Sequence, residues 1–434
     1  MKEFTGYQYL LMDVASHSPL GLDKKEFEER IEWAEAQVAL SPTALEEVAA
    51  ETEWKEKPMY IKAVMALRKA QQGIATGHLV SFDAVCSGMQ IMSALTGCYE
   101  GAKATGLVDP DRRADAYTQC TTLMSKILGY SFAASFMQNG NDLRKRVKNA
   151  VMTSLYGSRA EPIKEFGEDT PELKAFSQAI MQMAPGACQM LQDLLDSWQA
   201  WALSHGFIMP DGFDVRIKVK QRVEHQIEVD ELAHSRFTYV YYENAGEEKG
   251  VKNVANTTHS VDAYILRSVL RRCNYDKDVV QSAASMIQVE LLERSMVSWG
   301  AGPTLTPKNY SSEIKHYLKR YESNKMPDIY ILPYLTPITV RLIDTNHLKK
   351  LSSIINDMLK HEPFEVVTIH DDYKCHPNNM NELRYHYREI LAELADSTLL
   401  ADLLSQLHGI TGGKVTKLST DLSKYIRKSN YSLS

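Results

Sequence analysis

The sequence predicts an α+β fold that is mostly helical. Over most of the chain, apolar residues recur at three- and four-residue spacing, which is the pattern of amphipathic helices. Two short β-like runs, Leu79–Phe82 and Phe364–Ile369, each lead to an aspartate, and residues 213–242 alternate between apolar and polar side chains. With 434 residues, of which 44% are apolar, the chain is long enough for two or three domains with buried cores.

Charge and cysteine content narrow the class of protein. The formal net charge is −6, from 49 basic and 55 acidic residues, which argues mildly against a protein that coats DNA nonspecifically. The six cysteines show no CxxC spacing, and no run of about 18 apolar residues is present. We therefore expect a soluble protein of a reducing compartment, the cytoplasm, with no membrane contact.

The first hundred residues are predicted to hold helices that lead into one strand. Residues from Leu22 to Glu53 have the apolar spacing of a charged amphipathic helix, and Pro58 opens another helix that ends near Gln71. The run Leu79–Phe82 is β-like and stops at Asp83. Helical spacing returns from Gly88 to Thr96, so this strand is expected to have a helix directly after it.

The middle of the chain is predicted to be helical and to end in a hairpin. Helical patterns cover 110–128, 142–155 and 171–205. Residues 213–242 are predicted to form a β-hairpin whose first arm has a basic polar face, made by Arg216, Lys218, Lys220 and Arg222.

In the last third, a helix is predicted from Ser260 to Leu270. Residues 275–360 are mostly helical, with breaks at 300–307 and 333–337. The run Phe364–Ile369 is interpreted as a second buried strand, and 379–407 as amphipathic helix. No internal repeat or low-complexity segment is present.

The two aspartates Asp83 and Asp371 are candidate metal ligands. If both strands belong to one sheet, their carboxylates would lie together at one edge and could hold two Mg²⁺ ions about 4 Å apart, the arrangement that catalyses phosphoryl displacement. The structural alternative is that each aspartate only caps a turn, which is common at strand ends.

A stripe of residues on one predicted helix favours the metal-ligand interpretation of the two aspartates over the turn-cap interpretation. Arg144, Lys148, Met152 and Tyr156 recur every four residues, so they form one slowly turning line along the helix 142–157. Two cations at one end could bind a triphosphate, and the aromatic ring before Gly157 could contact a base. In the alternative, Met152 and Tyr156 are core residues and the cations are solvated, but cations are disfavoured near a helix N-terminus unless an anion offsets them.

Together these segments resemble the single-subunit phage-type and mitochondrial DNA-directed RNA polymerases. The resemblance rests on FDxxCSGxQ, which starts at Phe82, on R-x3-K-x3-M-x3-YG, which starts at Arg144, and on IHD, which starts at Ile369, in that order. It extends to GYQYLLMDVASHSPLGLDKKEFEERIEW near the N-terminus and to THSVDAYILRSVL, and more loosely to 401–434, which is similar to the C-terminal foot of the family.

The resemblance implies a right-hand polymerase palm and fingers, and it implies roles for single residues. The two metals would be held by Asp83, Asp371 and the backbone carbonyl of Ala84, with His370 beside the primer terminus. The incoming nucleotide would be bound by six residues: Arg144, Lys148, Met152, Tyr156, Gly157 and His259. Tyr156 would contact the templated base pair and help select ribose, and His259 would approach the minor groove. Without the resemblance, His259 is as well explained as a capping or core histidine, and His370 as a residue that orients the turn.

Gly88 separates RNA from DNA synthesis within this superfamily. DNA polymerases with this palm carry a glutamate five residues after the first aspartate, where it collides with a ribose 2′-hydroxyl, and here that position is Gly88. The sequence departs from the family at Ala84, Val85 and Asp372. We expect Asp372 to influence the charge of the site without binding metal directly.

The expected division of the chain is palm over 1–100, fingers over 101–258 and palm again over 259–434. The fingers would include the helix 142–157 and a promoter-reading specificity hairpin at 213–242, for which a purely structural hairpin is an equal alternative. The second palm segment would include a helical insertion at 275–360 and the C-terminal foot. No DxxGR segment, thumb or N-terminal domain is recognised.

These features are most similar to the larger polypeptide of the split, two-subunit RNA polymerase of some lytic bacteriophages. The resemblance implies a heterodimer in which a smaller subunit supplies the thumb and N-terminal elements. It also implies a DNA template, an RNA product, NTPs and a single-stranded-DNA-binding accessory protein in the cytoplasm of a bacterial host. Two alternatives stay open: a palm-class DNA polymerase or primase, and a non-catalytic nucleic-acid-binding subunit.

Overall fold

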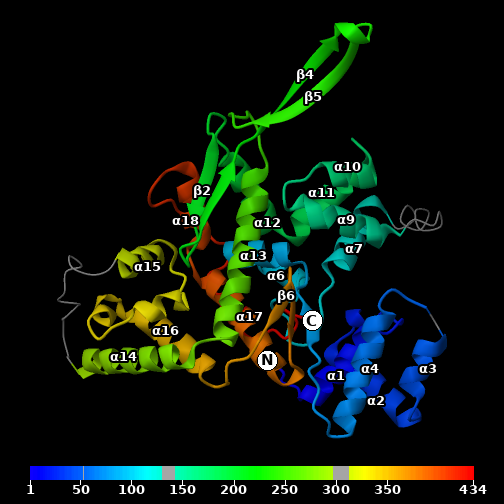
Figure 1. Ribbon diagram of the computed structural model, residues 1–434, viewed down its shortest axis with the longest axis vertical. Coiled ribbons are helices and arrows are strands. Elements are labelled where there is room, and N and C mark those ends of the chain that lie inside the picture. Colours follow the sequence, from blue (N-terminus) through cyan, green and yellow to red (C-terminus); the bar gives the residue numbers. More distant parts are fainter. Residues whose placement is uncertain (52, 130–141, 297–311) are drawn as a thin grey trace.

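A computed structural model of the protein describes residues 1–51, 53–129, 142–296 and 312–434 (Figure 1). Helices dominate and the described strands form three small sheets, so the predicted α+β class is confirmed. None of the helices in these ranges is both long enough and apolar enough to cross a membrane.

The N-terminal lobe is a group of four helices, drawn in blue in Figure 1. Its helices are α1 (Gly6–Ser16), α2 (Phe27–Leu40), α3 (Ala44–Glu51) and α4 (Lys57–Gln71). Thr5 begins α1 with a capping box to Gln8, which satisfies two otherwise unpaired N–H groups. The single helix predicted from Leu22 to Glu53 is corrected, because residues 41–43 separate α2 from α3. Within α2, Phe27, Ile31 and Ala34 are buried in the core, whereas Val38 is only partly buried.

The largest of the three described sheets has three antiparallel strands in the order β1-β7-β6. Their bounds are β1 (Val80–Asp83), β6 (Val367–Ile369) and β7 (Asp372–Cys375). Asp83 pairs with Asp372, and His370 and Asp371 form the two-residue turn between β6 and β7. His370 has φ 57°, a left-handed conformation that a tight hairpin turn requires.

The prediction of a buried strand at 364–369 is therefore corrected. Only its last three residues are a strand, and this strand lies at the sheet edge with Ile369 56% exposed. Apolar composition alone cannot distinguish an edge strand from a central one, because the difference lies in which neighbour pairs with it.

Three helices of the main core pack against one another: α5 (Ser87–Thr96), α13 (Lys252–Cys273) and α17 (Met380–Asp396). Every residue of α5 is buried. The predicted C-terminal foot contains α18 (Leu399–His408) and α19 (Leu422–Ile426), and its last residues return to the sheet. Leu433 bridges to Ala84, and the Ser434 N–H donates to the Asp83 carbonyl at 3.0 Å, so the end of the chain supports the end of β1.

The region after α5 is a helical lobe, which lies above the N-terminal lobe in Figure 1. Its helices are α6 (Tyr99–Ala104), α7 (Ala116–Leu128), α9 (Leu143–Ser154), α10 (Ala160–Phe166), α11 (Pro171–Met183) and α12 (Pro185–Asp196). The helix predicted over 171–205 is corrected to α11 and α12, because Pro185 starts a new helix and His205 lies in strand β2 (Ser204–Ile208).

The hairpin predicted at 213–242 is also corrected, because these residues belong to two hairpins. Strand β3 (Asp214–Lys218) pairs with β2, whereas β4 (Gln221–Val229) pairs with β5 (Ser235–Glu243). The second hairpin projects from the body as a long two-stranded ribbon (Figure 1). Arg216 and Lys218 therefore lie outside this ribbon, which carries two arginines against five carboxylates.

Residues 275–359 build a second hydrophobic core, separate from the main one. It is formed by α14 (Lys277–Met296), α15 (Ser312–Asn324), α16 (Thr345–Met358) and two 3-10 turns, Ile329–Tyr334 and Thr339–Leu342. The predicted break at 333–337 falls in and after the first of these turns, whereas the break at 300–307 lies outside the described residues. That this unit is an insertion relative to the family stays a prediction.

Candidate active site

A cavity of about 580 Å³ lies where α5, α9 and α13 meet the β6–β7 turn. It gathers residues that are far apart in the sequence. Nine of the sequence-predicted site residues line it: Asp83, Ala84, Gly88, Lys148, Met152, Tyr156, His259, His370 and Asp371. Arg144 and Gly157 are the two predicted site residues that do not line it.

The carboxylates of Asp83 and Asp371 meet at one end of this cavity because two backbone contacts join their strands. Asp83 pairs with Asp372 across the sheet, and the Ala84 N–H donates to the Asp371 carbonyl at 3.1 Å. Burial raises the pKa of Asp83 to about 7, with further increases from the charges of Asp371 and Asp372. Neighbouring carboxylates that raise the pKa of Asp83 in this way form a site in which a cation is favoured.

Asp372, although adjacent, has its own partners. Its carboxylate pairs with Lys374 at 3.2 Å and accepts a hydrogen bond from the Ser81 hydroxyl. It does not line the cavity. This arrangement fits the expectation that Asp372 influences the charge of the site without serving as a metal ligand.

The stripe on α9 divides into two parts. Asp142 caps the helix by accepting from the Lys145 N–H, and Arg144 pairs with Asp115 at 2.6 Å, so two carboxylates offset the cations of the first turn. Lys148 and Met152 lie further along the same face and line the cavity. Arg144 as found here is thus bound to a neighbouring helix, and its predicted contact with a triphosphate would require it to leave Asp115.

Tyr156 follows the end of α9 and is held by close neighbours. Its ring stacks on His259 with centroids 4.8 Å apart and an interplanar angle of 30°. A Cβ added to Gly88 would lie 2.6 Å from the Tyr156 hydroxyl oxygen, so only glycine leaves room for the ring in this position. Burial raises the pKa of Tyr156, with a smaller contribution from Asp262, so the phenol stays protonated and can donate a hydrogen bond.

Asp262 and Tyr117 are among the cavity residues that were not identified from the sequence. Asp262 lies one turn after His259 on α13, and burial together with the charge of Asp371 raises its pKa to about 6, although His370 opposes this shift. Tyr117, on α7, places its ring 5.7 Å from the Lys148 ammonium nitrogen and 5.8 Å from the Arg144 guanidinium carbon. The three-residue spacing from His259 could have indicated Asp262, whereas no local pattern indicates Tyr117.

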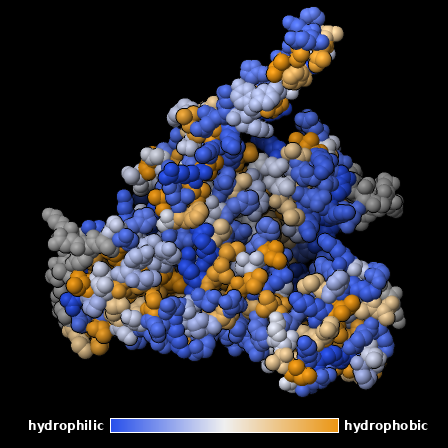
Figure 2. Space-filling view, viewed as in Figure 1, coloured by the Kyte–Doolittle hydropathy of each residue, from blue (hydrophilic) through white to orange (hydrophobic). Residues whose placement is uncertain are grey.

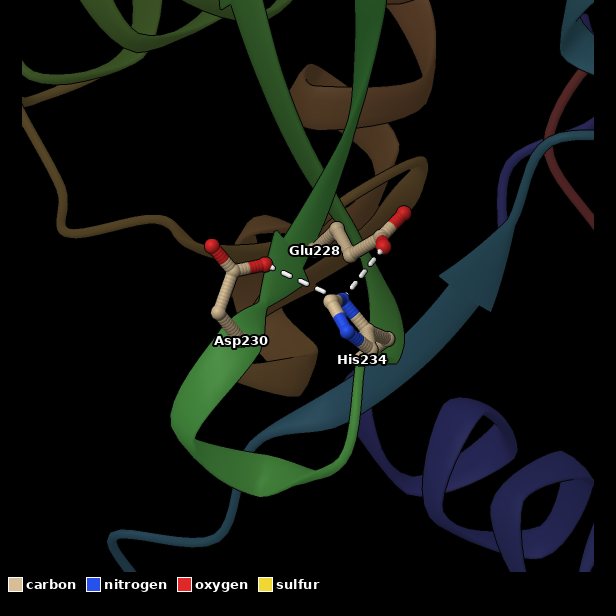
Figure 3. Close-up of side chains that lie close together, drawn as sticks. All are labelled: Glu228, Asp230 and His234. Atoms are coloured by element: carbon tan, nitrogen blue, oxygen red, sulfur yellow. Dashed lines mark hydrogen bonds and ion pairs between the residues drawn. The ribbon is translucent and has the colours of Figure 1, made fainter.

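A second group of potential ligands lies far from this cavity, at the tip of the ribbon. Figure 3 shows Glu228, Asp230 and His234, whose nearest side-chain atoms lie within 4.8 Å of one another. The Nδ1 atom of His234 lies 3.1 Å from an oxygen of each carboxylate. All three residues are exposed, and the imidazole already satisfies both carboxylates, so this group is a surface ion-pair cluster.

The cavity is chemically suited to a hard cation. Its carboxylates offer oxygen ligands, which Mg²⁺ prefers, and Lys148 is the one lysine or arginine among its described lining residues. Lys148 lowers the pKa of Asp83 only slightly, since that pKa stays near 7. An excess of negative charge therefore persists at the Asp83 end and would be offset by bound Mg²⁺ held by Asp83 and Asp371.

Comparison with known proteins finds similarity to one family over the first part of the chain. Residues 3–190 match the family model of DNA-dependent RNA polymerase. The chain is also 28% identical over 173 residues to "DNA-directed RNA polymerase 1, mitochondrial" of Arabidopsis thaliana, an alignment that covers 35% of this chain and 18% of that protein. The chain thus spans less than a fifth of the length of this relative.

The family match includes Asp83, Gly88 and the stripe on α9, whereas His259, His370 and Asp371 lie beyond it and are joined to the matched region by the cavity. The matched residues contribute β1, α5 and α9, which are the elements that place the first carboxylate, Lys148 and Tyr156. Residues 3–190 of this chain are thus similar to the DNA-dependent RNA polymerases, a family of nucleotidyltransferases.

Proposed function

We propose that this chain is the catalytic subunit of a DNA-directed RNA polymerase that adds ribonucleotides to an RNA 3′ end on a DNA template. The observation that carries the proposal is the single cavity that unites Asp83, Asp371, Lys148 and Tyr156. In the reaction, the terminal 3′-hydroxyl attacks the α-phosphate of an NTP and pyrophosphate leaves. Two Mg²⁺ ions would activate the attacking hydroxyl and stabilise the leaving oxygen.

The residues of the cavity would divide this work by position. Asp83 and Asp371, with the Ala84 carbonyl, would hold the metals, and His370 would lie beside the primer terminus. Lys148 would neutralise the triphosphate, because its ammonium group lies on the cavity side of α9. For Arg144 to contribute as well, nucleotide phosphates would have to replace Asp115 as its partner.

The base and sugar would be recognised at the opposite end. The stacked rings of Tyr156 and His259 form a flat surface against which a nascent base pair can lie, and Met152 extends this surface. Gly88 presents no side chain to a ribose 2′-hydroxyl, and the Tyr156 hydroxyl lies where a side chain of residue 88 would begin. This feature disfavours the alternative of a palm-class DNA polymerase or primase, in which a bulky side chain would stand there.

The proposed partners follow from the resemblance to split phage polymerases. A smaller subunit would supply thumb and N-terminal elements, and a single-stranded-DNA-binding protein would assist on the template. The proposed location is the cytoplasm of a bacterial host. A promoter-reading role for the ribbon β4–β5 is less well supported than its sequence suggested, since Arg216 and Lys218 lie on β3 and the ribbon carries more carboxylates than arginines.

Primer extension tests the proposal. The chain, combined with its candidate smaller subunit, is supplied with a primed DNA template, Mg²⁺ and either rNTPs or dNTPs. We expect extension with rNTPs that falls by about 10³-fold in Asp83→Asn and in Asp371→Asn, since each loses several kcal/mol of metal-mediated stabilisation. Asp276→Asn, which removes a carboxylate outside the cavity, is the control.

Each alternative function predicts another outcome of the same experiment. Extension with dNTPs alone would assign the chain to the DNA polymerases. Template binding without extension under any condition would make it a non-catalytic subunit. Extension that is unchanged in both aspartate variants would place the metals elsewhere.

A further inference from the structure

Among the described lining residues, Asp262 is the one carboxylate that the proposed mechanism leaves without a role. It lines the cavity from α13, one turn beyond His259. Three residues of helix advance about 4.5 Å along the axis, so both side chains lie on the same face of α13. Within the described residues, the Asp262 carboxylate accepts no hydrogen bond and makes no ion pair.

The surroundings of Asp262 locate it between the two ends of the site. Its carboxylate interacts electrostatically with His370 and Asp371 on the β6–β7 turn. Its charge also helps to raise the pKa of Tyr156, which lines the same cavity, and the pKa values of the buried Tyr373 and Tyr387. Among these groups, His370 is the only one that can carry positive charge. The negative charge of the Asp262 carboxylate is therefore poorly compensated.

A carboxylate without partners in a reactive cavity costs stability, because the charged form loses hydration. A polar group kept at such a cost is commonly one whose partner arrives with the substrate. An ionised carboxylate can only accept hydrogen bonds, so the missing partner is a donor.

The position identifies that donor. If Asp83 and Asp371 hold the metals, the attacking 3′-hydroxyl lies beside the β6–β7 turn, and the base of the terminal nucleotide lies toward His259 and Tyr156. The sugar would then lie between them, within the cavity that Asp262 lines from α13. Lys148 and Gly88, which would bind the incoming nucleotide, approach from α9 and α5 instead.

We propose that Asp262 accepts a hydrogen bond from the 2′-hydroxyl of the primer-terminal ribose, so that the enzyme extends an RNA end in preference to a DNA end. The inference rests on the proposed polymerase function, and it adds a selection step that differs from the choice of incoming nucleotide. Asp262 would align the terminal sugar, and through it the 3′-hydroxyl, for attack.

Two primers test the role of Asp262. They share one RNA sequence and differ only in whether the 3′-terminal nucleotide is ribo or 2′-deoxy. Single-nucleotide addition is measured with the full chain, its smaller subunit, a DNA template, Mg²⁺ and one rNTP. We expect the wild-type kcat/KM to be about tenfold to a hundredfold higher with the ribo end, the range typical of a hydrogen bond to a charged group.

In Asp262→Ala, the kcat/KM for the ribo-ended primer should fall to the value for the deoxy-ended primer. The kcat/KM for the deoxy-ended primer should not change. The KM for the incoming rNTP should stay the same, because that nucleotide contacts other residues. Asp278→Ala, a carboxylate of α14 outside the cavity, is the matched control and should keep the wild-type preference. Thermal melting checks folding, and Asp262→Ala should melt no lower than the wild type.

Two results would overturn this role: a ribo-to-deoxy ratio that is unchanged in Asp262→Ala, or an equal loss with both primers. A changed selection between rNTP and dNTP, with the primer-end ratio intact, would place Asp262 on the incoming sugar instead. If the wild-type protein extended neither primer, the proposed function itself would fail, which is a different result from an active enzyme with no primer-end preference.

Discussion

Two clusters of aspartate and histidine in this protein have opposite electrostatic character. In the N-terminal lobe, Asp13 is fully paired: His78 Nε2 lies 2.7 Å from one carboxylate oxygen, and His17 Nε2 lies 3.5 Å from the other. In the cavity, Asp83 and Asp262 face other carboxylates. Burial acts on all three groups, so their neighbours decide the sign of the shift.

The pKa values express this difference. Burial alone would raise the pKa of Asp13, but hydrogen bonds and charge from His17 and His78 outweigh it and lower that pKa. Burial and neighbouring carboxylates raise the pKa of Asp83 to about 7 and that of Asp262 to about 6. The paired cluster stabilises the fold, whereas the unpaired one stores unfavourable charge that a cation or a substrate can relieve.

Removal of the paired carboxylate should give the largest effect on stability. Asp13→Asn leaves the His17 cation buried without its main partner, and breaking such a pair costs about 3 kcal/mol. We expect the free energy of unfolding, measured by urea titration, to fall by this amount. Asp83→Asn is the matched change in the cavity and should cause no loss in the absence of Mg²⁺. Equal losses in the two variants would remove the distinction between the clusters.

The pH dependence of stability should separate the clusters next. Burial opposes protonation of His17, but Asp13 and Glu56 raise its pKa to about 9, from 6.5 in the unfolded chain. Its contribution is therefore fully present below pH 6.5 and is lost as the pH rises through 9, a change of roughly 3 kcal/mol. The stability difference between wild type and His17→Gln should shrink across this window.

The raised pKa of Asp83 makes stability depend on pH over a lower pH range than that of His17. Its stabilising contribution is present below the unfolded value of 3.8 and is lost as the pH rises through about 7. The stability difference between wild type and Asp83→Asn should therefore be constant from about pH 8 to 9. If the stability difference between wild type and His17→Gln were also constant from pH 6.5 to 9, then His17 would not be the group that titrates in this higher pH range.

The smallest expected effect concerns space in the cavity. In Gly88→Ala the new Cβ meets the end of the Tyr156 ring, which can move at little cost to stability but then leaves His259. We expect stability within about 0.5 kcal/mol of wild type. Nucleotide addition should fall about tenfold, or about 1.4 kcal/mol.

Gly77→Ala is the control for this change, because a Cβ at Gly77 has no atom within 4 Å. Both properties should stay at the wild-type value in this variant. Full activity in Gly88→Ala would show that the position of Tyr156 does not depend on the absence of a side chain at residue 88.

The sequence predicted well those features that depend on local pattern. The apolar spacing of Phe27, Ile31 and Ala34 indicated the helical character of α2, although not its end at Leu40. The run before Asp83 placed β1, and the spacing from Arg144 to Tyr156 placed α9 within one residue at its start and three at its end. Each of these signals is a periodicity of neighbouring residues, which backbone geometry converts directly into one face of an element. The two strand ends also predicted that Asp83 and Asp371 would lie together, and both aspartates line one cavity.

Features that depend on contacts between distant segments were predicted less well. The pairing of Arg144 with Asp115, the edge position of β6 and the separation of β3 from the ribbon each follow from which segments became neighbours. The basic residues at 216–222 looked like one face of a hairpin because alternation does not reveal the pairing partner of a strand.

By itself, the sequence determined that this chain carries two strand-associated aspartates and a cationic, aromatic helix in the order typical of a polymerase. Tertiary structure alone decided that Asp262 joins them in one cavity, that Asp372 is neutralised by Lys374, and that Gly88 makes room for Tyr156. The physical reason is that ionisation and steric fit depend on atoms a few ångströms away in space, which local sequence does not specify.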